Sequence, residues 1–398
     1  MTIFDSPVPV RSDGMALGSP QWLKEHRESG YHPDVAEVLD QVADQALRGY
    51  GGASFPVARK WQAALRSGGR GYVVANGAES EPASSKDASL MQLRPHLVLD
   101  GLNLAARSTR ADRGVLWLKR GAWHSRAALE RALAERRAAG LDDVPITIAE
   151  GPAHYLSGES SAVVNGLSAR PALPSTHRVP AAFSGIAGRP TVVHNVETLA
   201  RVSLVASGRA RRGDRLLTIS TPEGQTVVEA GAEDRLGALI SGLTNHEISA
   251  ALLGGYGGVW RAWESVATRP LGDVGSDVNA GIVMTLPSGA CGVVTTASIV
   301  RYLASSSAKQ CGPCIFGLGE LADVMDRVAA GRARRGDVAR LRQVSDTVAG
   351  RGACRHPDGA ITMLGTAITT FASDFGAHRR TQRCGKSHAV HAPGSRAA

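Results

Sequence analysis

The first half of the chain alternates between short apolar runs and longer stretches in which apolar side chains recur at helical spacing. Apolar runs at residues 71–77, 114–119 and 144–151 predict buried strands. The segments around them predict helices over residues 33–48, over 86–108 with a new start at Pro95, and over 122–139. Strands that alternate with helices are typical of a parallel, Rossmann-like α/β sheet.

The pattern changes after about residue 210. The short β-like runs LLTIS, TVVEA, GIVMTL and GVVTTA, with one short helix over residues 235–243, indicate a β-grasp-like α+β domain. From Ser298 to about residue 378 the chain has helical spacing, broken by a cysteine-containing loop and by residues 350–359. We therefore expect a Rossmann-like domain over 1–210, a β-grasp-like domain over 211–297, a helical domain over 298–380 and a mobile tail over 381–398.

Composition narrows the class of protein. The chain has 398 residues, of which 43% are hydrophobic and 20% charged, so it is long enough for several domains and is not a disordered chain. No apolar stretch reaches the length of a membrane span, and the N-terminus lacks the pattern of a secretory signal. We expect a cytoplasmic protein without membrane insertion, whose five cysteines serve as metal ligands, redox groups or core residues.

Two loops carry candidate binding chemistry. Three of the four residues from Gly49 to Gly52 are glycines, which lets backbone N–H groups approach an anion closely, and Lys60 follows as a candidate phosphate partner. Asn76, Glu79 and Glu81 follow a predicted strand, at the edge where parallel sheets bind ligands. A tight turn, a solvated lysine and a polar surface loop are the alternative interpretations.

Six motifs in order resemble one family, the NADH-binding flavoprotein subunits of respiratory NADH:quinone oxidoreductase (complex I), with relatives in NAD-linked hydrogenases and formate dehydrogenases. The motifs are GYGGASFPVARKW from Gly49, NGAESEPASSKDASLMQLRPHLVLDG from Asn76, YLSGESSAV from Tyr155, VPAAFSGIAGRPTVVHNVETL from Val179, SAKQCGPCIFG from Ser307 and ACRHPDG from Ala353. They cover roughly residues 45–378. The resemblance implies an FMN- and NAD(P)H-binding Rossmann-like domain and a C-terminal helical iron–sulfur domain.

The resemblance also implies site residues. Positions matching those that hold FMN in the family, with Tyr155 and Gly158 covering the flavin, are Gly49, Gly51, Gly52, Lys60, Asn76, Glu79, Ser80, Tyr155, Gly158, Glu159, Asn195 and Thr198. Phe55 matches the aromatic residue that stacks on the dinucleotide, and Glu81 matches the acid near its ribose. We assign Glu159 as the catalytic candidate. A flavin accepts two electrons from NAD(P)H as hydride and releases them singly to an iron–sulfur cluster.

Several positions depart from the family pattern in the cofactor pocket. Tyr50 replaces an arginine, Ser54 a glycine, Ala78 an aspartate, Ser160 a glutamate and His194 an asparagine. Loss of two acids and an arginine can change NADH affinity or the choice between NADH and NADPH. The alternative hypothesis is accordingly a non-catalytic electron-transfer or scaffold subunit of the same fold that has lost NADH oxidation.

The cysteines match three of four family ligands. Cys311, Cys314 and Cys354 occupy cluster-ligand positions for a 4Fe-4S cluster, whereas Ala308 stands where the family has a cysteine. The candidates for a fourth ligand are Cys384, a serine among Ser305, Ser306 and Ser307, or an exogenous group; the alternative for Cys384 is a free tail thiol. Cys291, in an apolar stretch, is predicted to be a core residue.

Other motif interpretations are weaker. The CGPC sequence also occurs in thioredoxin-like proteins, but the helical surroundings late in the chain do not match that fold. His154, His177 and His246 are isolated, and no HExxH or HxH pair indicates a catalytic zinc site.

The net charge of +9 and the arginine-rich stretches at 209–215, 332–342 and 379–383 are not accompanied by a nucleic-acid-binding motif. We expect an acidic redox protein such as a ferredoxin, or other oxidoreductase subunits, as the partner rather than nucleic acid. A plain solvated surface is the alternative.

Overall fold

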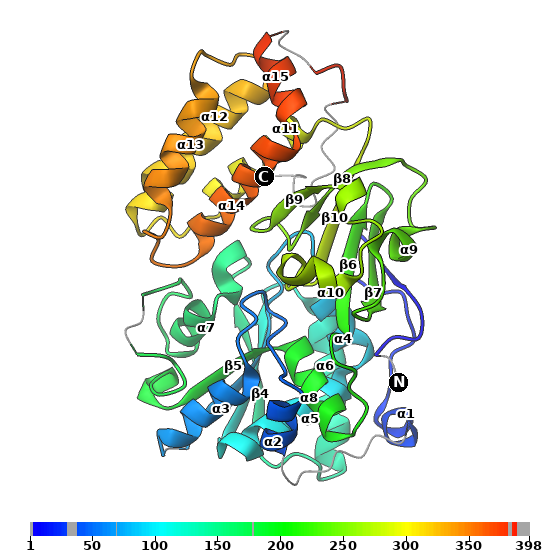
Figure 1. Cartoon of the computed structure of the whole chain (residues 1–398). Helices are drawn as coiled ribbons and strands as arrows, with labels where there is room; N and C mark the ends of the chain where they lie inside the picture. Colours follow the sequence, from blue (N-terminus) through cyan, green and yellow to red (C-terminus); the bar gives the residue numbers. More distant parts are fainter. Residues whose placement is uncertain (1–2, 30–37, 69, 177–178, 381–383, 388–398) are drawn as a thin grey trace.

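The computed structural model describes residues 3–29, 38–68, 70–176, 179–380 and 384–387 (Figure 1). A lower lobe contains a four-stranded sheet and its helices, a second sheet lies above it, and a helical lobe completes the top of the view. The sequence-based prediction of a mixed α/β protein with a parallel sheet is confirmed.

The four-stranded sheet has the order β4-β3-β2-β5, and all three strand pairs are parallel. Its strands are β2 (Tyr72–Gly77), β3 (Arg113–Lys119), β4 (Ile146–Gly151) and β5 (Thr191–Asn195). Alternate β2 residues face opposite cores: Val73 packs toward the side of α5 and α8, and Val74 packs toward the side of α7. Helices therefore cover both faces, as a parallel sheet requires.

The helices of this lobe are α1 (Leu23–Glu28), α2 (Val38–Asp44), α3 (Val57–Arg66), α4 (Lys86–Leu93), α5 (Pro95–Thr109), α6 (Trp123–Ala138), α7 (Ser160–Leu167) and α8 (Val196–Ala206), with short 3-10 turns η1 (Tyr155–Gly158) and η2 (Ile186–Gly188). The expected break at Pro95 is present, since α4 ends at Leu93 and Pro95 opens α5. The expected helix over 33–48 is present as α2 but ends at Asp44, so its predicted end was wrong: residues 45–48 form a turn and a β-bridge. Residues 33–37 lie outside the described residues.

The second sheet has six strands in the order β1-β7-β6-β10-β8-β9. Only the β6–β10 pair is parallel. Its elements are β1 (Val8–Val10), β6 (Arg215–Thr221), β7 (Gly224–Ala230), α9 (Leu236–Ile240), β8 (Ile248–Leu253), β9 (Val259–Ala262), η3 (Trp263–Ser265), α10 (Leu271–Val274), η4 (Gly275–Val278) and β10 (Ile282–Pro287). The expected short helix over 235–243 is α9, and a separate apolar core lies between it and the sheet.

The helical lobe contains α11 (Gly292–Ser305), the π-helical turn η5 (Pro313–Leu318), α12 (Gly319–Ala329), α13 (Asp337–Val348), α14 (His356–Thr370) and α15 (Ala372–Arg380). The prediction of a β-like run for GVVTTA was wrong, because these residues open α11. Val293, Thr296 and Ala297 are buried against the neighbouring helices, so tertiary packing outweighs the β propensity of branched side chains.

The segment expected to be a mobile tail is described only at residues 384–387. There, Ser387 pairs with Ala290 in a parallel β-bridge. The rest of 381–398 lies outside the described residues.

Candidate functional site

The glycine loop lies against the end of β5 and the start of α8. Gly52 has a φ of +92°, which favours glycine, and a Cβ on Gly51 would lie 3.3 Å from the Cβ of Asn195. The N–H of Tyr50 donates to Thr198 Oγ1 at 2.9 Å. The fold therefore brings together four predicted binding positions from distant parts of the sequence: Gly51, Gly52, Asn195 and Thr198.

Two of the departures from the family pattern have structural explanations in this loop. The Tyr50 hydroxyl donates to the carbonyl of Asp214 at 2.9 Å, so the side chain that replaces an arginine ties the loop to the chain entering β6. Ser54 has a φ of +48°, a conformation that the family's glycine adopts more easily. The loop keeps its shape at a small conformational cost.

The acidic loop after β2 meets the segment at η1. Asn76 Nδ2 donates to the carbonyl of Gly158 at 2.8 Å, and Ser80 Oγ donates to the carbonyl of Tyr155 at 2.6 Å. Because β2 and β4 are both parallel strands of the same sheet, the segments that follow them meet at one edge. The two predicted halves of the binding site are therefore in contact.

The three predicted acids have different environments. Glu79 accepts from the N–H groups of Asp87 (2.8 Å) and Ala88 (2.7 Å), so it caps α4. Glu159 accepts from the N–H groups of Ser161 and Ala162 and caps α7. These contacts are those of helix caps, and direct catalysis by Glu159 stays a prediction.

Glu81 is the chemically unusual acid. Its Oε2 accepts from the Tyr155 hydroxyl at 2.9 Å and from the N–H of Tyr256 at 3.1 Å. Its other oxygen, Oε1, is inaccessible and has no hydrogen-bond partner among the described residues. Burial raises the pKa of Glu81 to about 7. The free oxygen is a ready acceptor for a ligand hydroxyl or N–H group.

We expect Glu81 to make the stability of the ligand-free protein depend on pH. Between its ordinary value of 4.5 and about 7, the folded protein holds a proton that the unfolded chain has released. Raising the pH through this window therefore removes stability, by up to about tenfold in the folding equilibrium constant per pH unit. Urea unfolding of Glu81→Gln should show a flatter pH profile than wild type, whereas the exposed control Glu233→Gln should not. Equal slopes for wild type and Glu81→Gln would contradict this assignment.

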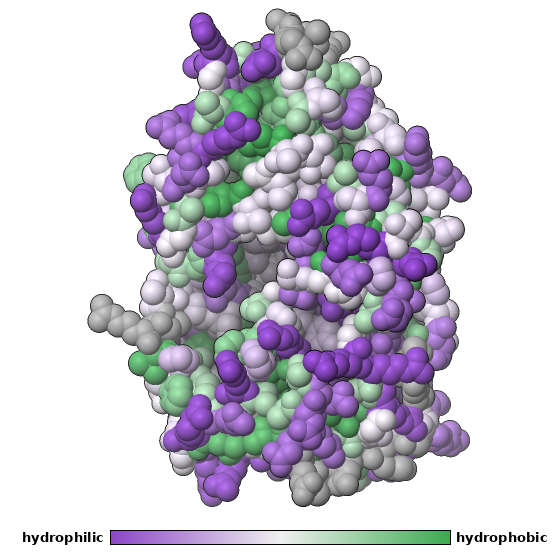
Figure 2. All heavy atoms as spheres, in the orientation of Figure 1, coloured by the Kyte–Doolittle hydropathy of each residue, from purple (hydrophilic) through white to green (hydrophobic). Residues whose placement is uncertain are grey.

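A pocket of about 620 Å³ opens beside the glycine loop. Its lining includes Phe55, Arg59, Lys60, Arg66, Ser160 and Phe183. The rings of Phe55 and Phe183 are 49% and 40% exposed, so both can stack on a planar ligand. Figure 2 shows the molecular surface hollowed between the lower lobe and the helical lobe.

The cations of this pocket suit an anionic ligand. The Lys60 ammonium donates to the carbonyl of Val193 at 2.8 Å, and burial lowers its pKa to about 8, so it stays mostly charged at neutral pH. Arg59 and Arg66 lie on the same helix, α3. Three cations and two exposed rings fit a dinucleotide, which carries phosphates and bases. Sequence reasoning missed Arg59, Arg66 and Phe183; the signal for Phe183 was its place in the VPAAF motif.

His194 replaces an asparagine inside the sheet. Trp61 Nε1 donates to His194 Nε2 at 2.8 Å, so the imidazole accepts at Nε2. Burial, with the nearby Lys60 ammonium, holds the pKa of His194 well below its usual range. His194 is therefore a neutral core residue behind the pocket.

The predicted cluster cysteines lie in the helical lobe. Cys311 and Cys314 precede and begin η5, and Cys354 precedes α14. Burial raises the pKa of the Cys314 thiol to about 12, with contributions from both Cys311 and Cys354. The pKa of Cys354 is raised by burial, and also by Glu159 and Cys311. The fold thus gathers the three cysteines and places Cys354 near the start of α7.

Contacts between lobes fix this placement. The Tyr155 ring lies 5.4 Å from the His356 ring and 5.8 Å from the Tyr302 ring, and Thr176 Oγ1 donates to the carbonyl of Ala353 at 3.3 Å. Tyr155 also holds Glu81 through its hydroxyl. The Tyr155 side chain therefore contacts both the acidic loop predicted to bind FMN and the helical lobe that carries the cysteines.

The candidates for the missing fourth cluster ligand differ in their hydrogen-bond partners and neighbouring side chains. Ser305 Oγ donates to the carbonyl of Tyr302 at 2.8 Å. Ser307 Oγ is buried and has no hydrogen-bond partner among the described residues. Cys384 instead lies with Cys291 and His378.

Two family models match separate parts of the chain. The family model of the Nuo51 FMN-binding domain matches residues 42–204, and that of the NADH-ubiquinone oxidoreductase-F iron-sulfur binding region matches residues 294–378. In both regions the chain is similar to NADH oxidoreductase flavoprotein subunits. It therefore carries an FMN-binding domain and a 4Fe-4S binding region.

Several relatives match most of the chain. A Salmonella typhimurium subunit of NADH-quinone oxidoreductase is 29% identical over 404 residues, covering 89% of both chains, and the Mycobacterium bovis protein of the same name is 27% identical, covering 86% of this chain and 84% of the relative. A solved structure of an NAD+-reducing nickel–iron hydrogenase in the H2-reduced state matches with a TM-score of 0.79 and 26% identity, covering 87% of this chain. This chain spans only 63% of that hydrogenase chain.

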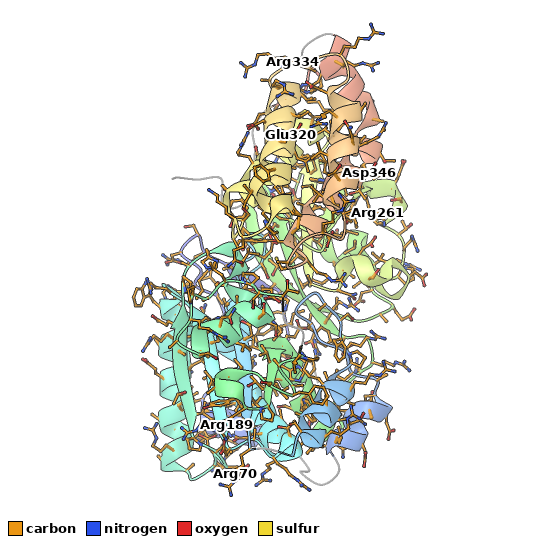
Figure 3. All side chains as sticks on the ribbon, turned by 90° about the vertical axis from the view of Figure 1, so that its left-hand side faces the viewer. Arg70, Arg189, Arg261, Glu320, Arg334 and Asp346 are labelled. Atoms are coloured by element: carbon orange, nitrogen blue, oxygen red, sulfur yellow. The ribbon has the colours of Figure 1, made fainter. Side chains whose placement is uncertain are left out.

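Some of the surface arginines form ion pairs. Arg327 contacts Asp337 at 2.9 Å, and Arg340 contacts Glu320 at 2.6 Å. Arg334 and Glu320 lie in the upper lobe, and Arg189, which pairs with Asp112 at 2.7 Å, lies at the base of the lower lobe (Figure 3). Within the described residues, no helix has both the length and the apolar character that a bilayer span needs.

Proposed function

We propose that this flavoprotein subunit transfers electrons from NADH through FMN to a 4Fe-4S cluster and on to another oxidoreductase subunit. The observation that carries the proposal is the contact of the Tyr155 ring with the His356 ring at 5.4 Å, which puts the predicted flavin loop beside the cysteine loop. When bound, the flavin supplies the exchange between two-electron and one-electron chemistry.

The residues of this chain fit both FMN and a 4Fe-4S cluster. Gly51 lets the glycine loop lie close against Asn195, where a Cβ would come within 3.3 Å of the Asn195 Cβ, and Glu81 Oε1 is a buried acceptor without a partner among the described residues. We propose that Lys60 and the loops 49–52 and 76–81 hold FMN, and that Cys311, Cys314 and Cys354 hold the cluster. Phe55, Phe183 and Arg59 bind and orient NADH, and Glu81 accepts a hydrogen bond from it.

We also propose the domain limits that the sequence predicts: 1–210, 211–297, 298–380 and 381–398. The six-stranded sheet with α9 packed on it supports a β-grasp-like second domain. A cytoplasmic location stays a prediction. An acidic ferredoxin as acceptor stays one too; within the described part of the arginine-rich stretches, Arg340 pairs with Glu320.

The alternative, a subunit that has lost NADH oxidation, is favoured by one observation. Ala78 is 1% exposed and packs in the core beside Val163, so the carboxylate that the family pattern has there is replaced by an apolar contact. Ser160, which replaces a glutamate, lines the pocket without a charge.

One experiment separates the two functions. Anaerobically purified protein is titrated with NADH while its visible and EPR spectra are recorded. Bleaching of a bound flavin followed by the EPR signal of a reduced cluster is expected. Bound cofactors that NADH leaves oxidised would favour the alternative. A colourless protein after reconstitution with FMN, iron and sulfide would overturn the proposed electron transfer and leave only the scaffold form of the alternative.

We expect Ser307 to supply the fourth cluster ligand. Its buried hydroxyl lacks a partner among the described residues and stands next to Ala308. Ser307→Ala should lose about a quarter of the cluster iron and change the EPR line shape, and Ser307→Cys should keep the full iron content. The matched control is Ser305→Ala, because the Ser305 hydroxyl already donates to the Tyr302 carbonyl. Unchanged iron and EPR signals in Ser307→Ala would exclude this ligand.

A further inference from the structure

A second group of sulfur and nitrogen side chains lies in the core of the helical lobe. One ligand atom from each of Cys291, His378 and Cys384 lies within 4.8 Å of the others. The Cys291 sulfur is 3.3 Å from His378 Nε2, and both residues are 1% exposed. Cys384 was one sequence-based candidate for the fourth cluster ligand, whereas Cys291 and His378 were not predicted to bind the cluster.

The orientation of His378 suits metal binding. Its Nδ1 lies 3.1 Å from the carbonyl of Val328, an acceptor, so Nδ1 carries the ring proton. The lone pair of Nε2 then faces the Cys291 sulfur. Metal-binding histidines are typically held in this way, with the second ring nitrogen donating to a backbone carbonyl.

The segment that carries Cys384 is anchored on both sides of the loop that carries Cys291. Ser387 N donates to the carbonyl of Gly289 at 2.8 Å, and Cys291 N donates to the carbonyl of Ser387 at 3.1 Å. The Lys386 ammonium lies 3.0 Å from Asp374 on α15. Backbone pairing and an ion pair therefore hold the third ligand in place.

We propose that Cys291, His378 and Cys384 bind one zinc ion. Zinc takes thiolate sulfur at about 2.3 Å and imidazole nitrogen at about 2.0–2.1 Å, so its tetrahedral ligands lie roughly 3.5–3.8 Å apart. The spacing of these three atoms, all below 4.8 Å, fits a single ion. Two thiolates balance the charge of Zn²⁺, and their two protons leave to solvent on binding.

The remaining coordination position goes to a water molecule, because no fourth His, Cys, Asp or Glu of the described residues joins the group. The ion ties the start of α11, the helix α15 and the segment 384–387 together. Its role is structural: it cross-links these three segments of the helical lobe. This inference does not depend on the proposed electron transfer.

The test is metal analysis of the whole protein together with variants. Anaerobically purified wild type should contain about one zinc per chain in addition to its iron. Cys384→Ser should lower the zinc content by about tenfold or more and leave flavin and iron unchanged. The matched variant Cys354→Ser should do the reverse, losing iron and keeping zinc. Cobalt-loaded wild type should show a thiolate-to-cobalt absorption band that Cys384→Ser lacks.

Limited proteolysis tests whether the zinc ion holds the segment 384–387 in place. The segment 384–387 should be cleaved faster in Cys384→Ser, or after zinc chelation, than in zinc-loaded wild type. Cys384 lies at the edge of the lobe, so this variant keeps the test valid even where the buried Cys291→Ser fails to fold.

Three outcomes would overturn the proposal. The first is wild type that neither contains zinc nor takes it up from added zinc chloride. The second is loss of iron in place of zinc in Cys384→Ser, which would assign this thiol to the cluster. The third is a disulfide between Cys291 and Cys384 in the anaerobically purified protein.

Discussion

Replacing Lys86 with methionine is expected to lower the free energy of unfolding by about 3–5 kcal/mol. The Lys86 ammonium is buried and lies 2.7 Å from Asp87 Oδ1 and 2.9 Å from Glu197 Oε2. Its removal leaves Asp87 in the core without a cation and leaves Glu197 with Arg201 alone, at 3.6 Å. Burial already raises the pKa of Asp87 to about 7 against the opposing effect of Lys86. Equilibrium unfolding in urea measures the loss.

Two controls define the Lys86 result. Lys24→Met removes an exposed lysine whose ion pair with Glu28 spans 3.8 Å, and should change stability by less than about 0.5 kcal/mol. Lys86→Met combined with Asp87→Asn removes the carboxylate that is left without a cation and should recover part of the loss. A single Lys86→Met variant as stable as Lys24→Met would show that the buried charges are already neutralised in some other way.

The same network supports the candidate site. Asp87 Oδ2 accepts from Asn195 Nδ2, and Asn195 caps α8 beside the glycine loop. Glu197 accepts from the N–H of Leu216 at the start of β6. We therefore expect Lys86→Met to weaken flavin retention as well, measured as the flavin-to-protein absorbance ratio after gel filtration.

Replacing Cys354 with serine is expected to have the largest functional effect. The thiol is one of three cysteines gathered at the predicted cluster, where Ala308 already removes the family's fourth. Loss of a second thiolate should abolish the cluster EPR signal and reduce NADH-driven electron transfer to a one-electron acceptor on the order of 100-fold. Flavin bleaching by NADH should persist, because Cys354 does not line the pocket beside the glycine loop.

The control for Cys354→Ser is Thr369→Ser, a conservative change at an exposed position on the helix that follows Cys354, α14. It should match wild type in iron content and in electron transfer. An intact cluster signal in Cys354→Ser would remove Cys354 from the ligand set and would leave Cys311 and Cys314 to be explained by another chemistry.

Motif spacing predicted the main parts of the site because those motifs are local. The glycine loop, the NGAESEP loop and the CGPC turn each lie within one short segment, so their chemistry can be read from neighbouring residues. The same holds for the parallel sheet, whose strands are continuous apolar runs. The run GVVTTA was wrongly predicted to be a strand. Its residues have β propensity, but they open α11, where packing in the helical lobe outweighs that propensity.

Contacts between residues far apart in the sequence could not be predicted from sequence patterns. Spacing gave no sign that Cys291, His378 and Cys384 meet, since 87 residues separate the first two. It left Cys384 as a candidate fourth cluster ligand or a free tail thiol, whereas the structure places Cys384 beside Cys291 and His378.

The sequence by itself determined the family, the parallel sheet and the residue types of the candidate flavin and cluster sites, because these depend on local backbone freedom and on chemistry at fixed spacing. Tertiary structure alone decided which acids are helix caps and which one, Glu81, keeps an oxygen for a ligand. It also left the Ser307 hydroxyl without a partner among the described residues and brought Cys291, His378 and Cys384 together. The physical reason is that burial and hydrogen-bond partners are set by the packing of distant segments, and those partners fix the chemistry of each side chain.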